Sequence, residues 1–187
     1  ALMRSWRDGF GEPVASFLIV QLPNYSKTSP EIREAQLLSA LSDGHAAAVV
    51  TADVGEVEDI HPRNKRPVGE RLALAARALC YGENIDGLSP AYRAAVFAGG
   101  KGALTFLHAG SGLELRGAGG FEVCGADYRW VPAEARPVAP DRIEVWAPAV
   151  ASPVAARYAW SNTPTLTLYG RNGLPASPFR TYDPLKP

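Results

Sequence analysis

The stretch best able to do chemistry is GEVEDIHPRNK, residues 55–65, in which His61 follows Glu58 by three positions and Asp59 by two. An imidazole titrates near neutral pH and can take a proton from a nucleophile. A carboxylate on its other ring nitrogen fixes the tautomer and stabilises the imidazolium. A carboxylate two or three residues earlier on the same loop can turn back to the ring. The segment therefore offers a general base with its acidic partner, and an exposed His–Asp pair without function is the alternative.

Two apolar runs place this segment in a sheet. Residues 17–20 and 46–54 are apolar with β-branched members, the pattern of strands buried on both faces of a parallel sheet. The loops after them, 21–29 and 55–66, would then meet at the carboxyl edge of the sheet. Open α/β sheets carry their catalytic and binding groups at that edge.

Three helices are predicted between and beside these runs. The first covers residues 1–10, where Leu2 and Trp6 lie one turn apart before a Gly-Glu-Pro stop. The second begins at Ser29-Pro30, an N-cap and a first-turn proline, and has apolar residues at roughly helical spacing, namely Ile32, Ala35, Leu38 and Leu41. The third runs from Pro67 to about Tyr81, with one apolar face made by Val68, Leu72, Ala75 and Leu79. The chain opens as if on a helix already under way, so we expect an upstream segment.

The second half of the chain has a different character, and we place a boundary near Leu88. Residues 1–88 hold five prolines and 89–187 hold eleven. Short apolar or alternating segments between Gly and Pro turns predict an antiparallel β-layer there, at 103–106, 121–123, 142–146 and 156–160. Three aromatic residues of this half can stack on a sugar, although filling a β-layer core is commoner: Tyr158, Trp160 and Tyr169.

Composition excludes several kinds of partner. Nineteen basic residues balance nineteen acidic ones, so no positive surface exists for nucleic acid or anionic lipid. The sequence contains no run of about 18 apolar residues, the length that a membrane-spanning helix needs. Cys80 and Cys124 lack the spacing of zinc or thioredoxin motifs, and a disulfide between them is neither indicated nor ruled out. We expect no nucleic acid, membrane or metal partner.

Five segments together resemble the sialate O-acetylesterase family of SGNH serine hydrolases. The histidine segment DIHPRNKRPVGERLALAARALCYG is similar to that family's histidine block. Four others agree in order, and the resemblance spans nearly the whole chain: FLIVQLPNY, IREAQ, VTADVGE and ARYAWSNTPTLTLYGRNGLPASPFRT. The family resemblance implies the C-terminal part of a flavodoxin-like, parallel three-layer α/β/α domain over residues 1–88, followed by a β-rich antiparallel segment over 89–187.

The same resemblance implies an enzyme that removes acetyl groups from sialic acid or related sugars without a cofactor. His61 becomes the general base. Its acidic partner is Asp59 first, then Glu58, with Asp53 as a third candidate. Gln36, in the Arg-x-x-Gln pattern that begins at Arg33, and Asn24 become candidate substrate-binding residues.

One departure from the family is decisive for function. The family's Gly-Gln-Ser-Asn nucleophile segment does not occur in this sequence. We therefore expect an N-terminal fragment or chain of the same protein to supply the serine. An acetylxylan or xyloglucan esterase and, from another class, a non-catalytic carbohydrate-binding or interface module remain the alternatives. Action on extracellular glycans is consistent with a periplasmic, secreted or lysosome-like location and does not assign one.

Overall fold

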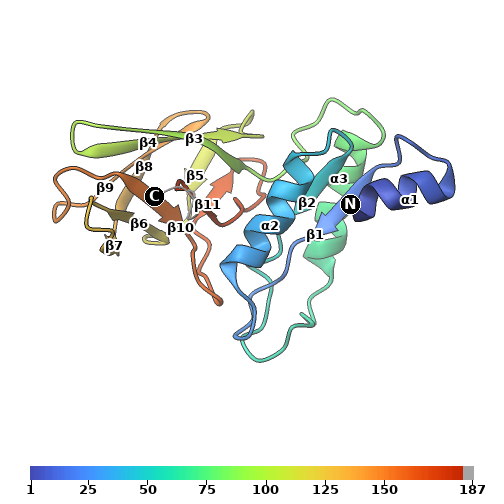
Figure 1. Ribbon diagram of the computed structural model, residues 1–187, viewed down its shortest axis with the longest axis horizontal. Coiled ribbons are helices and arrows are strands. Elements are labelled where there is room, and N and C mark those ends of the chain that lie inside the picture. Colours follow the sequence, from blue (N-terminus) through green and yellow to red (C-terminus); the bar gives the residue numbers. More distant parts are fainter. Residues whose placement is uncertain (183–187) are drawn as a thin grey trace.

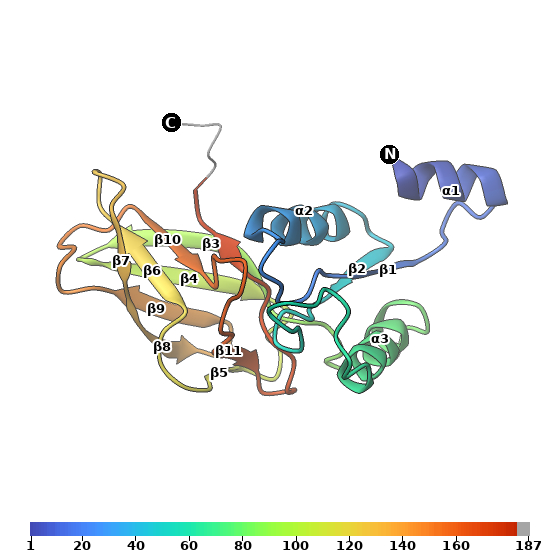
Figure 2. The ribbon, with the colours of Figure 1, turned by 90° about the horizontal axis from the view of Figure 1, so that it is seen from below.

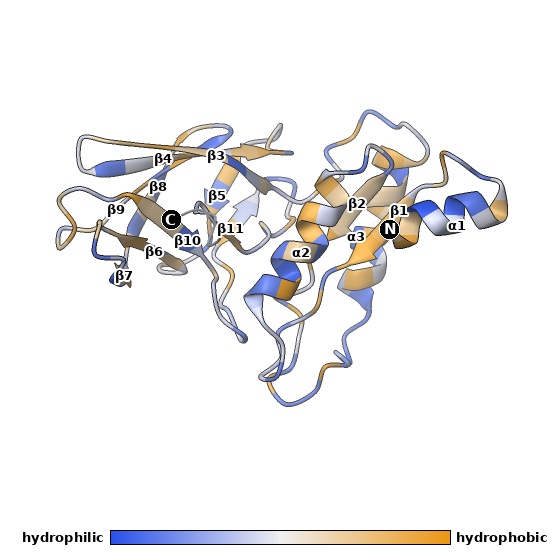
Figure 3. Cartoon of the chain, in the orientation of Figure 1, coloured by the Kyte–Doolittle hydropathy of each residue, from blue (hydrophilic) through white to orange (hydrophobic). Residues whose placement is uncertain are grey.

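The first half of the chain forms a small parallel sheet between helices. A computed structural model describes residues 1–182. Strands β1 (Phe17–Val20) and β2 (Ala46–Val49) pair in parallel, with Phe17 opposite Ala46. Figure 2 shows α2 (Pro30–Leu41) on one face of this sheet and α3 (Arg66–Leu79) on the other. Helices thus lie over both faces of the apolar strands (Figure 3), but β1 buries no residue fully and Val20 is 41% exposed, so the predicted burial on both faces is only partly met.

The second strand is shorter than the predicted 46–54. β2 ends at Val49, and residues 50–52 stay buried without pairing in the sheet. The carbonyl of Val50 accepts a hydrogen bond from Arg71 of α3, and Thr51 accepts one from the amide of Val54. These contacts turn the backbone out of the sheet toward α3, so the catalytic-edge loop begins earlier than the apolar pattern indicates.

The helices differ from the predictions in which faces they bury. On α2 the apolar stripe of Ile32, Leu38 and Leu41 faces outward. The exposed fraction of these three residues is between 39% and 56%. The residues that α2 buries after Pro30 are Arg33, Leu37 and Ala40, at spacings of four and three. Ser29 precedes α2 with an extended backbone but makes no capping hydrogen bond through its hydroxyl. Helix α1 (Leu2–Phe10) buries no residue at all.

The second half is an antiparallel β-structure. One sheet has the order β3-β4-β9-β8 and a second has β12-β10-β6-β7. The strands of the first are Ala91–Ala98, Lys101–Leu107, Arg142–Trp146 and Glu134–Ala139. Those of the second are Phe179–Arg180, Ala155–Tyr158, Phe121–Cys124 and Trp130–Pro132. Short strands β5 (Leu113–Leu115) and β11 (Leu168–Gly170) pair with each other, and both four-stranded sheets contribute to one apolar core.

The chain is thus a mixed α/β structure in which most sheet pairing is antiparallel. The change from helices to strands falls between α3 and β3, around Leu88 (Figure 1). The halves nevertheless share packing, because Val50 and Ala52 belong to the core of the β-structure. The division into two domains stays a prediction.

The two cysteines are not joined, and the helices α1 to α3 are not of the membrane-spanning kind. Cys80 is exposed, Cys124 is buried, and both are free thiols. Across residues 1–182, no helix has the length and apolar character needed to cross a bilayer.

Candidate active-site edge

The two loops that follow β1 and β2 lie together at one edge of the parallel sheet, at the bottom of Figure 1. The amide of Ser26 donates to the carbonyl of Val57 over 2.8 Å, which joins the first loop to the second. A Cβ atom on Gly55 would lie 2.2 Å from the carbonyl oxygen of Asn24. Only glycine allows this approach, since no other side chain fits at that distance. The loop carrying His61 is therefore held against the loop carrying Asn24.

A fully buried arginine organises this edge. Arg33, 0% exposed in the first turns of α2, donates from Nε to the carbonyl of Leu22 over 2.9 Å. Its Nη2 donates to the carbonyls of Pro23 and Asn162, each over 2.7 Å, and its Nη1 donates to that of Ser161 over 2.9 Å. Burial lowers the pKa of Arg33 to about 10, so it is charged at neutral pH. One cation thus ties α2, the first loop and the 161–162 turn together.

The 161–162 turn reaches the same loop a second time. Asn162 donates from Nδ2 to the carbonyl of Ser26 over 2.8 Å. Because Ser26 also bonds the second loop, the β-structure braces the edge on which His61 lies. Arg33, Leu37 and Ala40 follow helical spacing, so the sequence places Arg33 on one helix face with two apolar residues but does not indicate which carbonyls it binds.

His61 itself is exposed on the second loop. Its backbone amide donates to Oδ1 of Asp59 over 2.8 Å, the Asx-type turn expected of an aspartate two residues before its partner. Glu58 is exposed, and Pro62, directly after His61, is buried and anchors the loop. Within residues 1–182 the His61 imidazole forms no hydrogen bond or ion pair. The structure therefore brings Asp59 to the backbone of His61 rather than to its ring.

The third acidic candidate has a different partner. Both carboxylate oxygens of Asp53 accept from Arg71 of α3, each over 2.6 Å, and both side chains are mostly buried. This bidentate pair fixes α3 against the end of β2. Asp53 is consequently committed to the frame of the loop and is unavailable to orient His61.

The two candidate substrate-binding residues at this edge differ in their hydrogen bonding. Gln36 accepts from the amide of Leu22 over 2.8 Å and donates to the carbonyl of Val20 over 3.3 Å, so both ends of its amide hold the backbone after β1. Asn24 has a buried Oδ1 with no hydrogen-bond partner among residues 1–182. An unsatisfied buried acceptor is costly, and Asn24 shares this state with Gln21 Oε1 and Thr28 Oγ1 on the same loop.

No family model matches the sequence, and no curated protein matches it. Among the solved structures that match is the crystal structure of a carbohydrate acetylesterase from Xanthomonas citri, with a TM-score of 0.90 and 43% sequence identity. This chain is similar to part of a carbohydrate acetylesterase. The match covers 96% of this chain and 44% of the acetylesterase, so the chain spans less than half of its neighbour's length.

Metal ligands and aromatic residues are the other candidate groups in the part of the chain that the structure describes. No group of three or more His, Cys, Asp or Glu side chains could hold a metal ion there. Tyr158 is a core residue, since its buried hydroxyl accepts from the amides of Thr167 and Leu168 over 2.7 Å each. A cavity of about 290 Å³ lies at the amino-terminal end of β2, opposite the His61 loop, and is lined by His108 among others.

Proposed function

We propose that this chain is part of a carbohydrate acetylesterase of the SGNH serine-hydrolase type. The observation that carries the proposal is the 43% identity, over 96% of the chain, to a solved carbohydrate acetylesterase. The position of His61 on a strand-end loop supports it, because α/β enzymes carry their catalytic groups there. The substrate class is an acetylated sugar, with sialic acid and xylan or xyloglucan acetates as alternatives that use the same residues.

In this proposal His61 acts as the general base. A serine hydroxyl attacks the acetyl carbonyl carbon while the His61 imidazole takes the hydroxyl proton. The C–O bond to the sugar then breaks, and the imidazolium returns the proton to the departing sugar oxygen. Water repeats the sequence on the acetyl-serine and releases acetate. Exposure of the ring on its loop leaves it accessible to a serine from another segment.

Asp59 is the favoured partner of the imidazolium. Its Oδ1 already holds the turn through the amide of His61, and its second oxygen is free to meet the ring once a partner segment orders the loop. Glu58 is the second choice, three residues before His61 and exposed. Asp53 is the least suited, since Arg71 binds both of its oxygens.

Asn24 and Gln36 receive different roles. Asn24, beside the His61 loop, is proposed to bind a sugar hydroxyl only after a shift of the two loops exposes its Oδ1, which is buried and unpaired in this arrangement. Gln36 is proposed to act on substrate only through the backbone after β1, which it holds at both ends of its amide. Direct contact between Gln36 and the sugar remains a prediction of the resemblance.

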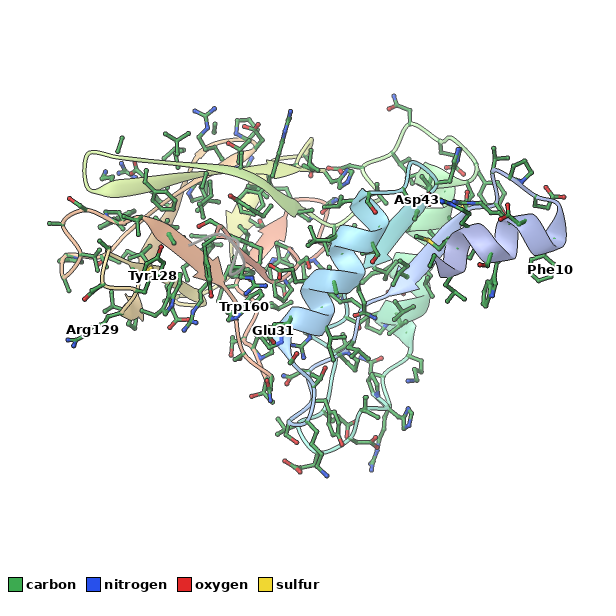
Figure 4. All side chains as sticks on the ribbon, viewed as in Figure 1. Phe10, Glu31, Asp43, Tyr128, Arg129 and Trp160 are labelled. Atoms are coloured by element: carbon green, nitrogen blue, oxygen red, sulfur yellow. The ribbon has the colours of Figure 1, made fainter. Side chains whose placement is uncertain are left out.

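The serine is proposed to come from a further segment or chain of the same protein. Such a segment has a surface to cover, because α1 exposes Leu2 by 64%, Trp6 by 50% and Phe10 by 78%. These three side chains are four residues apart and share one face of α1, and Figure 4 shows Phe10 at its outer end. More than half of the acetylesterase neighbour has no counterpart in this chain, which is enough for the nucleophile-bearing part.

The test is hydrolysis of an aryl acetate by the protein in its natural length. His61→Ala is expected to lower kcat by at least about 10³-fold, the scale of losing a catalytic base. The matched control is His45→Ala, which removes another exposed histidine at the opposite end of β2 and is expected to leave kcat unchanged. Equal rates for wild type and His61→Ala would remove His61 from the mechanism. An absence of hydrolysis in all three proteins would favour the non-catalytic carbohydrate-binding or interface module instead.

A further inference from the structure

A groove lies between α2 and the β-structure. It is separate from the loop that carries His61. Its volume is about 470 Å³, within the range of small-molecule sites. The α2 side is apolar and partly exposed, with Leu38 56% and Leu41 39% accessible. The β side contributes Tyr92 and Phe179, whose rings stack at 4.8 Å between centroids. The apolar C–H face of a sugar ring packs against such a floor more favourably than water does.

The charged groups of the groove are not balanced. Glu34 of α2 and Arg180 of β12 form a bidentate pair with contacts of 2.7 to 3.1 Å, so these two charges cancel. Arg93 also lines the groove, and no carboxylate lies within 4.0 Å of its guanidinium nitrogens among residues 1–182. The groove therefore keeps one net positive charge beside an apolar floor.

The backbone of β3 accounts for the position of Arg93. Tyr92 pairs with Phe106 and Ala94 with Thr105, so Arg93 is an extra residue that has no partner across the strand pair. Such a bulge changes the direction in which a strand presents a side chain and is often found beside functional sites. A strand that only needed to pair with β4 would not require it.

We infer that this groove binds a sugar unit that carries a carboxylate, with Arg93 receiving the carboxylate and the apolar floor receiving the ring. Guanidinium groups bind carboxylates through paired, charge-assisted hydrogen bonds, and among residues 1–182 the groove offers Arg93 no carboxylate within ion-pair distance. The sugar carboxylate could belong to a sialic acid or to a uronic acid, since both present the same group.

The groove lies close enough to the proposed active-site edge to serve the same oligosaccharide. Arg180, at its rim, stacks over Trp160 with 4.8 Å from guanidinium carbon to ring centroid. Trp160 directly precedes Ser161, whose carbonyl binds Arg33 at the active-site edge. Figure 4 shows Trp160 near Glu31, at the start of α2. This continuity rests on the proposed function, whereas binding of the sugar in the groove does not.

The experiment is calorimetric titration of the natural-length protein with three probes. These are the methyl glycoside of N-acetylneuraminic acid, digalacturonic acid and, as a neutral comparison, xylobiose. At least one acidic probe is expected to bind at least about 10-fold more tightly than xylobiose, the scale of one charge-assisted pair. Arg93→Ala is expected to remove that preference, and Arg93→Lys to retain part of it because the charge remains.

Arg142→Ala is the matched control, since Arg142 is an exposed arginine on β9 of the same sheet and does not line the groove. It is expected to bind all three probes like wild type. Equal affinity for acidic and neutral probes, or an acidic preference that survives in Arg93→Ala, overturns the inference. The acidic preference is also expected in His61→Ala. If that variant still hydrolyses aryl acetate at the wild-type rate, the proposed function fails while the groove assignment stands.

Discussion

Removing the guanidinium of Arg33 is expected to loosen the whole edge that carries His61. Burial lowers its pKa from the ordinary arginine value to about 10, which corresponds to a cost of about 3 kcal/mol for the charged form. Four carbonyl contacts from two segments offset this cost, at about 1.5–3 kcal/mol each for hydrogen bonds to a charged group. Arg33→Met relieves the burial cost but leaves four carbonyls without their donor.

We expect Arg33→Met to lower the free energy of unfolding by about 3–5 kcal/mol, as when one partner is removed from a buried charged network. That is a large fraction of the 5–15 kcal/mol typical of folded proteins. The assay is urea unfolding together with amide hydrogen exchange at Ser26, whose amide joins the two loops. Arg129→Met is the control, because Arg129 is 88% exposed through its side chain and lies at the far end of the β-structure in Figure 4.

A loss in Arg33→Met no larger than that of Arg129→Met would refute this account. So would a full loss of stability with unchanged exchange at Ser26, because the clamp would then not act on the loops. Arg33→Lys adds a pH test. Burial lowers the pKa of a lysine from its ordinary value of about 10.4, so between the two values the unfolded state binds more protons. The stability of Arg33→Lys should therefore rise with pH across that window, whereas the Arg33 guanidinium of wild type contributes such a rise only above about pH 10.

Three further predictions concern single contacts. Gly55→Ala should cost about 3 kcal/mol or more of unfolding free energy and displace the His61 loop, because its Cβ would lie 2.2 Å from the Asn24 carbonyl oxygen. Hydrogen bonds from Arg7, and after them one from the amide of His45, hold the pKa of Asp43 at about 2, below its ordinary 3.8. The stability from these contacts is present above 3.8 and lost as pH falls through about 2. NMR titration of Arg7→Met should show the pKa of Asp43 raised toward its ordinary value, with the part due to the His45 amide retained. Tyr158→Phe should cost about 1–3 kcal/mol in thermal unfolding, since two buried amides lose their acceptor; a neutral result for Tyr158→Phe would mean that water replaces the hydroxyl.

Local patterns predicted the elements well where one physical signal dominates. The apolar run of 17–20 is β1 to the residue, and the helix after Pro30 is α2, because burial and proline each act locally. The predicted strand 46–54 is too long, since Arg71, from a helix further along the chain, captures the Val50 carbonyl. The prediction that the apolar stripe of α2 would be its buried face was also wrong, because apolar spacing identifies a helix without saying which face is covered.

The sequence by itself determined the chemistry on offer at the active-site edge. It placed His61 beside Asp59 and Glu58 on a loop after a buried strand, and the order of strand and helix determined that this loop meets the one carrying Asn24. It also determined that no Gly-Gln-Ser-Asn segment lies in these 187 residues.

Only the tertiary structure decided how that edge is held. The partners of Arg33 at Ser161 and Asn162 lie about 130 residues away in sequence, a pairing that no local spacing can encode. The same is true of Asp53, which looked free to serve His61 until Arg71 was seen to bind both its oxygens. Residue types set which interactions are available, but competition among partners in three dimensions decides which of them each polar group makes.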